Sequence, residues 1–176
     1  MKSYNILAQI IDLVDFKVIE PETSGVIKKL REKSVLSMAL TARMCSMSDN
    51  PDRELLRAEI DFFKAAVHDG EIRFNSTSSY KKGVLYTGPE LRKGECLILF
   101  FEKIGYIPEK VVFVDDSKGN VEDVHKTLHS KDIPVTCLRY GATDAREAKF
   151  DPAVSEKELC DYIGKERYNE VFKELL

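Results

Sequence analysis

The chain of 176 residues is long enough for one domain with a sizeable core, and its composition is that of an ordinary globular protein. Its net charge of −3, from 27 basic against 30 acidic residues, gives no electrostatic support to nucleic-acid binding. No apolar run reaches membrane-spanning length and the first residues do not resemble a signal peptide, so we expect a cytoplasmic location, without nucleic acid or membrane as partner.

The apolar spacing of residues 3–14 predicts an amphipathic helix. Further along, helices are expected over residues 25–33, from Asn50 toward Phe63, over 93–105, over 120–131 and from Pro152 onward. Strands are expected over 34–43, 83–88, 110–116 and 133–141, and a polar loop over 74–83. The four cysteines (Cys45, Cys96, Cys137 and Cys160) lie far apart without a C-x-x-C pair, which indicates neither zinc nor a disulfide framework.

The alternation of strands and helices predicts an α/β protein with a parallel sheet that helices cover on both faces. In such sheets ligands bind beyond the carboxyl ends of the strands. Thr41, Thr87 and the acidic pair Asp115–Asp116 fall at those ends. The sequence therefore predicts that any site lies at this edge.

Asp115 and Asp116 directly follow an apolar strand, and two adjacent carboxylates repel each other. The pair indicates a cation site or a catalytic site, with Asn120 placed to orient the acids or to add a ligand. The alternative is a polar turn followed by a helix cap.

Three segments in order, "VLSMALTAR", "KG" at Lys93–Gly94 and "VVFVDDSKGN", resemble motifs two, three and four of the haloacid-dehalogenase-like (HAD) hydrolase superfamily. Together with "IEPETSGVIKKLREK", "GVLYTG" and "IPVTCLRYGATD", they are closer still to an uncharacterised bacterial branch labelled as a domain of unknown function. The resemblance covers about residues 17–150. It implies a Rossmannoid parallel sheet and Mg²⁺-dependent hydrolysis of phosphomonoesters.

The resemblance also implies roles for single residues. Thr41 matches a hydroxyl that binds a phosphoryl oxygen, and Lys93 matches a lysine that neutralises the phosphoryl group. Asp115 and Asp116 match carboxylates that hold Mg²⁺, with Asn120 as a further metal ligand. The alternatives are a polar residue that ends a strand at Thr41 and a solvated lysine at position 93.

Two other features allow a functional and a structural interpretation. Arg43 is placed to bind a substrate anion, although a surface salt bridge explains it equally well. His125 and His129 have the i, i+4 spacing of a zinc pair, but without an evident third ligand an exposed helix face is the favoured interpretation.

The nucleophile motif of that superfamily, D-x-D-x-[TV], does not occur in these 176 residues, and neither Asp12 nor Asp15 can replace it. The resemblance thus implies a truncated core over residues 21–176 that lacks its first, central strand, preceded by a helical cap remnant over residues 1–20. Without the nucleophile we expect no activity from the chain alone and weakened Mg²⁺ affinity.

Two alternatives remain open: a non-catalytic binding or assembly module, and one half of a split enzyme. A phosphorylated small molecule is the expected ligand. Because the missing strand leaves two inner edges unpaired, we expect a homodimer, a complementing N-terminal chain, or residues 1–20 folded into the gap. The best internal substitute strand is Asp15–Ile19.

Overall fold

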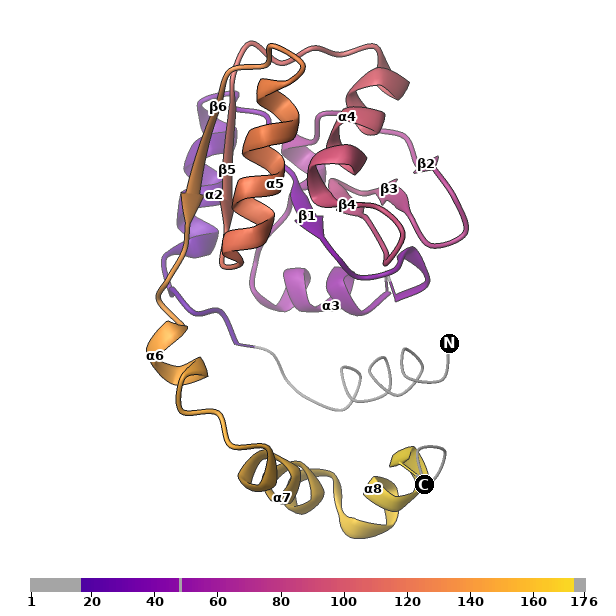
Figure 1. The fold of residues 1–176 in the computed structure, drawn as a ribbon, viewed down its shortest axis with the longest axis vertical. Coiled ribbons are helices and arrows are strands. Elements are labelled where there is room, and N and C mark those ends of the chain that lie inside the picture. Colours follow the sequence, from indigo (N-terminus) through magenta and orange to yellow (C-terminus); the bar gives the residue numbers. More distant parts are fainter. Residues whose placement is uncertain (1–16, 48, 173–176) are drawn as a thin grey trace. The chain divides into compact units, whose positions relative to one another are not determined.

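The computed structural model describes residues 17–47 and 49–172 (Figure 1). Its contacts divide the chain into a unit Val18–Gly141 and a second unit that contains the described residues from Ala142 onward. The helix predicted over residues 3–14 lies outside the described residues.

The unit Val18–Gly141 alternates short strands with helices, which confirms an α/β fold. Its helices are α2 (Thr23–Glu32), α3 (Asp49–Arg57), α4 (Lys93–Ile104) and α5 (Lys118–His129), with 3₁₀ turns at Cys45–Met47 and Phe63–Ala65. Its strands are β1 (Ala39–Thr41), β2 (Ile72–Arg73), β3 (Ser79–Lys81), β4 (Val84–Tyr86), β5 (Val111–Asp115) and β6 (Val135–Arg139).

The strands form two sheets, one of four strands in the order β1-β4-β3-β2 and one of two strands, β5-β6. β1 runs parallel to β4, with Leu40 opposite Leu85, and β5 runs parallel to β6, with Phe113 opposite Cys137. β2 and β3 are antiparallel, so the prediction of a wholly parallel sheet is wrong at this edge. β1 and β5 lie in different sheets and do not pair with each other.

The segment 74–83, predicted as a polar loop, contains β3 and leads through a tight turn into β4. Gly83 has φ of 79°, and a Cβ there would lie 2.7 Å from the carbonyl carbon of Phe62, so only glycine fits. Tyr80 of β3 is fully buried, and its ring centroid lies 4.5 Å from that of Phe100. The prediction of a loop was therefore wrong: the segment is polar in composition, yet its strand β3 buries Ser79 and Tyr80.

The strand predicted over residues 34–43 is reduced to β1, because β4 offers only three residues for pairing. Ser34 has φ of 58°, and Val35 and Leu36 before the strand remain exposed. The helix predicted from Asn50 toward Phe63 ends at Arg57, and Glu59 follows with φ of 55°. Both errors concern the ends of elements rather than their existence.

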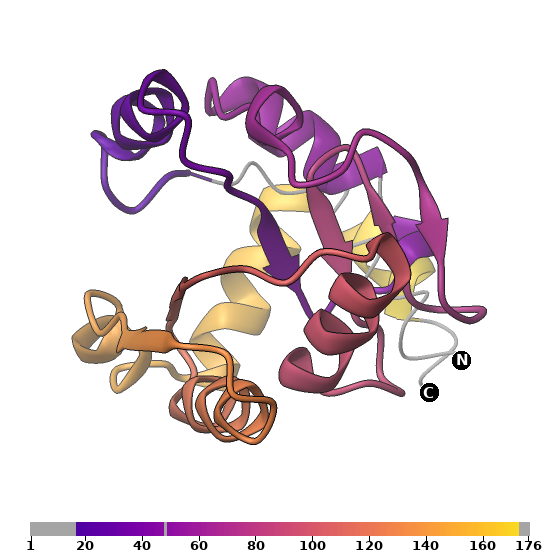
Figure 2. The same cartoon turned by 90° about the horizontal axis from the view of Figure 1, so that it is seen from above.

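One hydrophobic core joins both sheets to α4 and α5, which lie on the same side of the strands (Figure 2). Gly94 of α4 allows the close approach of α5, because a Cβ there would lie 2.6 Å from Oγ1 of Thr127. On the other side, Val112 and Val114 of β5 are 62% and 55% exposed. The expectation of helices on both faces is therefore wrong for β5 within the described residues.

The described residues from Ala142 onward form α6 (Asp144–Glu147), α7 (Pro152–Ile163) and α8 (Lys165–Phe172). Asp151 caps α7, since its side chain accepts a hydrogen bond of 2.9 Å from the Ala153 N–H. Pro152 occupies the first turn, where it disrupts no helical hydrogen bond. The predicted helical tail is confirmed. No helix in the described part of the chain has the length and apolar character to span a membrane.

Candidate functional site at the strand ends

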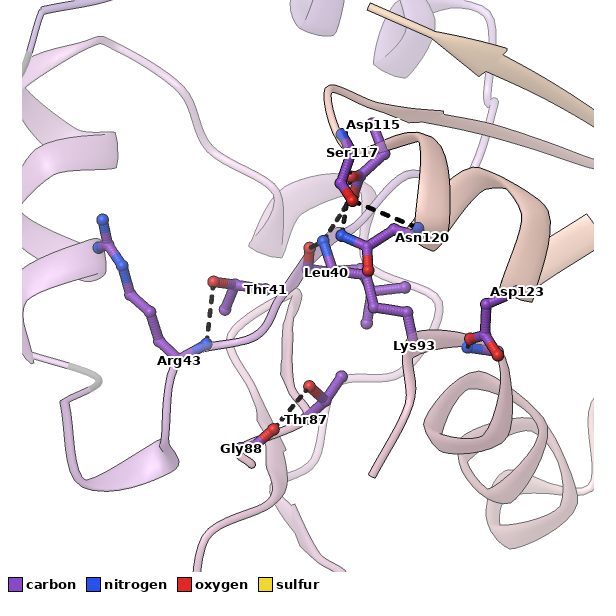
Figure 3. Close-up of polar contacts among 11 residues, drawn as sticks. Leu40, Thr41, Arg43, Thr87, Gly88, Lys93, Asp115, Ser117, Asn120 and Asp123 are labelled. Atoms are coloured by element: carbon purple, nitrogen blue, oxygen red, sulfur yellow. Dashed lines mark hydrogen bonds and ion pairs between the residues drawn. The ribbon is translucent and has the colours of Figure 1, made fainter. Parts of the chain in front are cut away.

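Three residues predicted to share a site meet at one edge of the strands (Figure 3). β1 ends at Thr41, β5 ends at Asp115, and α4 begins at Lys93. The ammonium of Lys93 donates to Oδ2 of Asp115 at 2.6 Å and to the backbone carbonyl of Leu40 at 3.1 Å. The expected convergence of Lys93 with Asp115 is thus observed, and Lys93 also joins β1 to β5.

The Lys93–Asp115 ion pair is buried, with 10% and 6% of the two side chains exposed. Burial alone would raise the pKa of Asp115, but hydrogen bonds from Lys93, Asn120 and Ser117 together outweigh it. The pKa of Asp115 therefore lies below its usual value, and the carboxylate is ionised at neutral pH.

The second oxygen of Asp115 is engaged as well. Oδ1 accepts a hydrogen bond of 2.9 Å from the Ser117 N–H and another of 2.9 Å from the side-chain amide of Asn120. Ser117 also caps α5, because its hydroxyl oxygen accepts from the Asn120 N–H at 3.4 Å. Asn120 thus orients Asp115, and the polar-turn interpretation holds for the same residues.

Asp116 is exposed, in contrast to its buried neighbour. Its backbone carbonyl accepts a hydrogen bond of 3.1 Å from Nε of Arg139. β5 ends at Asp115, so Asp116 already belongs to the turn that follows the strand. The two therefore lie in different environments.

The remaining predicted residues surround this pair less closely. Thr41 accepts a hydrogen bond of 3.3 Å from the Arg43 N–H, and the side chain of Arg43 extends away from Lys93 and Asp115 (Figure 3). Thr87 is buried at the end of β4, and its hydroxyl donates to the Gly88 carbonyl at 3.1 Å. Neither threonine hydroxyl contacts Lys93 among the described hydrogen bonds.

Asp123 belongs to the site although the sequence analysis did not single it out. Its Oδ2 accepts a hydrogen bond of 2.8 Å from the Gly94 N–H, in the first turn of α4, and its Oδ1 lies 3.9 Å from Arg92. The signal in the sequence is weak: an acid three residues after Asn120, on the helix that starts at the strand end.

A pocket of about 420 Å³ opens between the first turns of α4 and α5. The positive ends of two helix dipoles and the cations Arg92 and Lys93 lie at this pocket, and the carboxylate of Asp123 opposes them. The pocket is lined by Ala42, Thr87, Gly88, Leu91, Arg92, Lys93, Gly119, Asn120 and Asp123.

The binding of Mg²⁺ at this edge stays a prediction. Mg²⁺ needs several oxygen ligands; both oxygens of Asp115 accept hydrogen bonds, and Asp116 is exposed. In the described part of the chain, no group of three or more His, Cys, Asp or Glu side chains is arranged around a common point. His125 and His129 are stacked on an exposed face of α5, with ring centroids 6.1 Å apart.

Taken together, these features define an α/β protein with a polar site where strand ends meet helix starts. Comparison with protein families places it more closely. The chain belongs to the family described as "Protein of unknown function (DUF2608)", whose model matches residues 1–166.

Two curated relatives, both from Chlamydia, carry the name "Putative outer membrane protein". The one from Chlamydia trachomatis serovar D is 28% identical over 138 residues, which cover 78% of this chain and 50% of the relative. The one from Chlamydia muridarum is 26% identical over 140 residues, which cover 80% and 52%. The chain thus spans about half the length of these relatives. No solved structure matches it.

The family match corrects the assignment that the sequence motifs suggested. Membership of the haloacid-dehalogenase-like superfamily is replaced by membership of DUF2608, whose description assigns no activity. The labels hydrolase and phosphatase-like rested on that resemblance and fall with it. The contacts among Lys93, Asp115 and Asn120 do not depend on it.

Proposed function

We propose that the pocket between α4 and α5 binds the phosphate group of a small phosphomonoester, and that this chain alone does not turn the ligand over. The observation that carries the proposal is the position of Lys93, which is buried against Asp115 at the start of α4. A phosphate there would lie at the positive ends of two helix dipoles and beside the cation Arg92.

The polar partners of Lys93 support binding rather than chemistry. Asp115 holds Lys93 at 2.6 Å, and Asn120 and Ser117 hold Asp115, so the lysine is fixed before any ligand arrives. A fixed cation loses little conformational entropy on binding, which favours affinity. Among the described residues, the carboxylates of Asp115 and Asp123 accept hydrogen bonds that fix the starts of α4 and α5, which favours a positioning role for both.

Titration with phenyl phosphate, followed through the backbone amide resonances, tests the proposal. We expect shifts at Gly94, Gly119 and Asn120, and no release of phenol with or without added Mg²⁺. Arg92→Gln should weaken binding without unfolding the chain, because the Arg92 side chain is 84% exposed. Lys131→Gln, which removes another exposed cation, is the matched control. Absence of these shifts, or equal weakening by both variants, would contradict the proposal.

A second candidate is a non-catalytic assembly module, and the open edges of β1 and β5 favour it. Within the described residues each of these strands pairs on one side only. We propose that the two sheets are parts of one Rossmannoid sheet with a vacant central strand position. Such a chain would act through the partner that fills the position.

The cellular location remains a proposal. The printed name of the Chlamydia relatives refers to an outer membrane, whereas the sequence features favour the cytoplasm. Fractionation of cells that express the protein, with a cytoplasmic and an outer-membrane marker, distinguishes the two.

A further inference from the structure

The edge of β1 that faces β5 has backbone groups available for a further strand. β1 bonds to β4 through Ala39 and Thr41: the Ala39 N–H donates to Gly83 and the Thr87 N–H donates to Thr41, both at 2.9 Å. Because backbone groups of successive residues in a strand point to opposite sides, the N–H and C=O of Leu40 face away from β4. The Leu40 carbonyl oxygen accepts a hydrogen bond from Lys93. The second lone pair of that oxygen and the Leu40 N–H are therefore available to a further strand.

β5 shows the same pattern toward β1. Its bonds to β6 include the Val111 N–H to the Pro134 carbonyl and the Tyr140 N–H to the Asp115 carbonyl, both at 2.8 Å. The alternation leaves the backbone groups of Val112 and Val114 on the side away from β6. Neither residue has a described strand partner on that side.

The two edges belong to one layered structure. Figures 1 and 2 both show the strands in the order β6, β5, β1, β4, and all four strands run in the same direction. Leu40 of β1 and Phe113 of β5 pack in one core beneath α4 and α5. Lys93 joins the two strands only at their carboxyl ends. The backbone of one parallel strand between them would satisfy both rows of polar groups.

We propose that β1 and β5 accept a single extended strand, parallel to both, supplied from outside these 176 residues. This inference rests on the proposed vacant strand position and not on phosphate binding. The occupant would be a short apolar segment of β-branched residues, because its side chains on one face would contact the Leu40–Phe113 core. Its carboxyl end would reach Lys93.

The chain's own N-terminal segment fits the position poorly. Ile6, Ile10 and Val14 recur every four residues, which is the period of a helix and not of a strand. Residues 17–19, which belong to the predicted substitute strand Asp15–Ile19, form no strand in the structure, whereas residues 15 and 16 lie outside the described part. About half of each Chlamydia relative lies beyond the match, which is ample length for a donor strand.

Amide exchange of the isotope-labelled chain tests the proposal. The probes are overlapping synthetic peptides that together cover the half of the Chlamydia trachomatis relative outside the match. We expect the amides of Leu40, Val112 and Val114 to exchange quickly in the free monomer, and one peptide or an overlapping pair to slow all three by about tenfold or more. Val114→Pro removes one N–H from the open edge and should abolish this protection. Val114→Thr keeps the N–H and the β-branched shape, and should preserve it.

Three results would overturn the proposal. If these amides are protected in the free monomer and lose protection when residues 1–16 are deleted, the chain fills the position itself. If protection rises with concentration together with dimer formation in light scattering, a second copy fills it. If no peptide protects them, the edges accept no such strand. Binding of phenyl phosphate is measured separately, so its failure leaves the strand proposal unaffected.

Discussion

The carboxylate of Asp123 accepts a hydrogen bond of 2.8 Å from the backbone N–H of Gly94, so a side chain of α5 caps the first turn of α4. Arg92, at the N-cap position of α4, provides no side-chain cap of its own. The negative charge of Asp123 also lies at the positive end of the α4 dipole. Together with the Lys93–Asp115 pair, this contact fixes the start of α4 against α5 and β5.

Loss of this cap should destabilise the fold. Asp123→Ala removes the acceptor and is expected to lower the free energy of unfolding by about 1–2 kcal/mol, as for other helix caps. Asp123→Asn keeps an acceptor oxygen and should recover part of the loss. Urea unfolding measures both. Glu122→Ala is the matched control, since Glu122 makes only an exposed pair with Lys118 at 3.7 Å; an equal effect of both alanine substitutions would refute the capping role.

Two glycines near the pocket should respond in opposite ways to alanine. In Gly94→Ala the new Cβ would lie 2.7 Å from Cβ of Thr127 and 3.0 Å from the Asp123 carbonyl oxygen, so α4 and α5 must separate. We expect a loss of about 1–3 kcal/mol. In Gly119→Ala the nearest atom would lie 3.8 Å away, and stability should rise by up to about 1 kcal/mol. Thermal unfolding of both variants decides the point, and a stabilised Gly94→Ala would contradict the close packing.

The elements that the sequence predicted well are those with a long, regular pattern. α4 was expected over 93–105 and observed over Lys93–Ile104, where Gly105, with φ of 64°, ends it. β5 and β6 follow apolar runs that lead directly into turns. Lys93 and Asp115 could be expected to meet because strand ends and helix starts share one edge of an α/β sheet.

The errors arise where tertiary contacts override local pattern. β3 could not be found because Ser79 is buried in it as a polar residue. Asp123 reaches the site only because Gly94 lets α5 approach α4, which no spacing in the sequence reveals. The family was misjudged because the assignment rested on short motifs around Thr41 and Asp115, whereas the family model matches residues 1–166 as a whole.

The Lys93–Asp115 pair should matter more for stability when one partner is removed than when both are replaced. Lys93→Met leaves the buried Asp115 carboxylate without its cation, and the expected loss is about 3–5 kcal/mol. Adding Asp115→Asn removes the charge and should recover a large part of it. A double-mutant cycle by urea unfolding measures the coupling. Lys131→Met, which breaks an exposed pair with Glu102, should change little, and additive effects at Lys93 and Asp115 would argue against a buried pair.

The last prediction concerns acid. The pKa of Asp115 in the folded chain lies below its unfolded value of about 3.9, because hydrogen bonds from Lys93, Asn120 and Ser117 outweigh the effect of burial. At low pH the unfolded state therefore binds more protons than the folded state, and stability rises with pH in that range. The contribution of Asp115 is complete above the unfolded pKa and is lost as the pH falls from about 4 through the folded pKa.

Unfolding free energies measured between about pH 6 and pH 2 should show this loss, and Asp115→Asn should reduce the slope below about pH 4 by up to one proton. The variant is less stable overall, so the slopes are compared and not the absolute values. Asp61→Asn is the matched control: the pKa of Asp61 is also lowered, since its hydrogen bonds and ion pair with Lys64 outweigh the effect of burial, but its side chain is 38% exposed. Asp61→Asn should change the slope of the unfolding free energy against pH less than Asp115→Asn does. An unchanged slope in Asp115→Asn would mean that Asp115 titrates alike in both states, and the buried contact with Lys93 would then contribute nothing to acid stability.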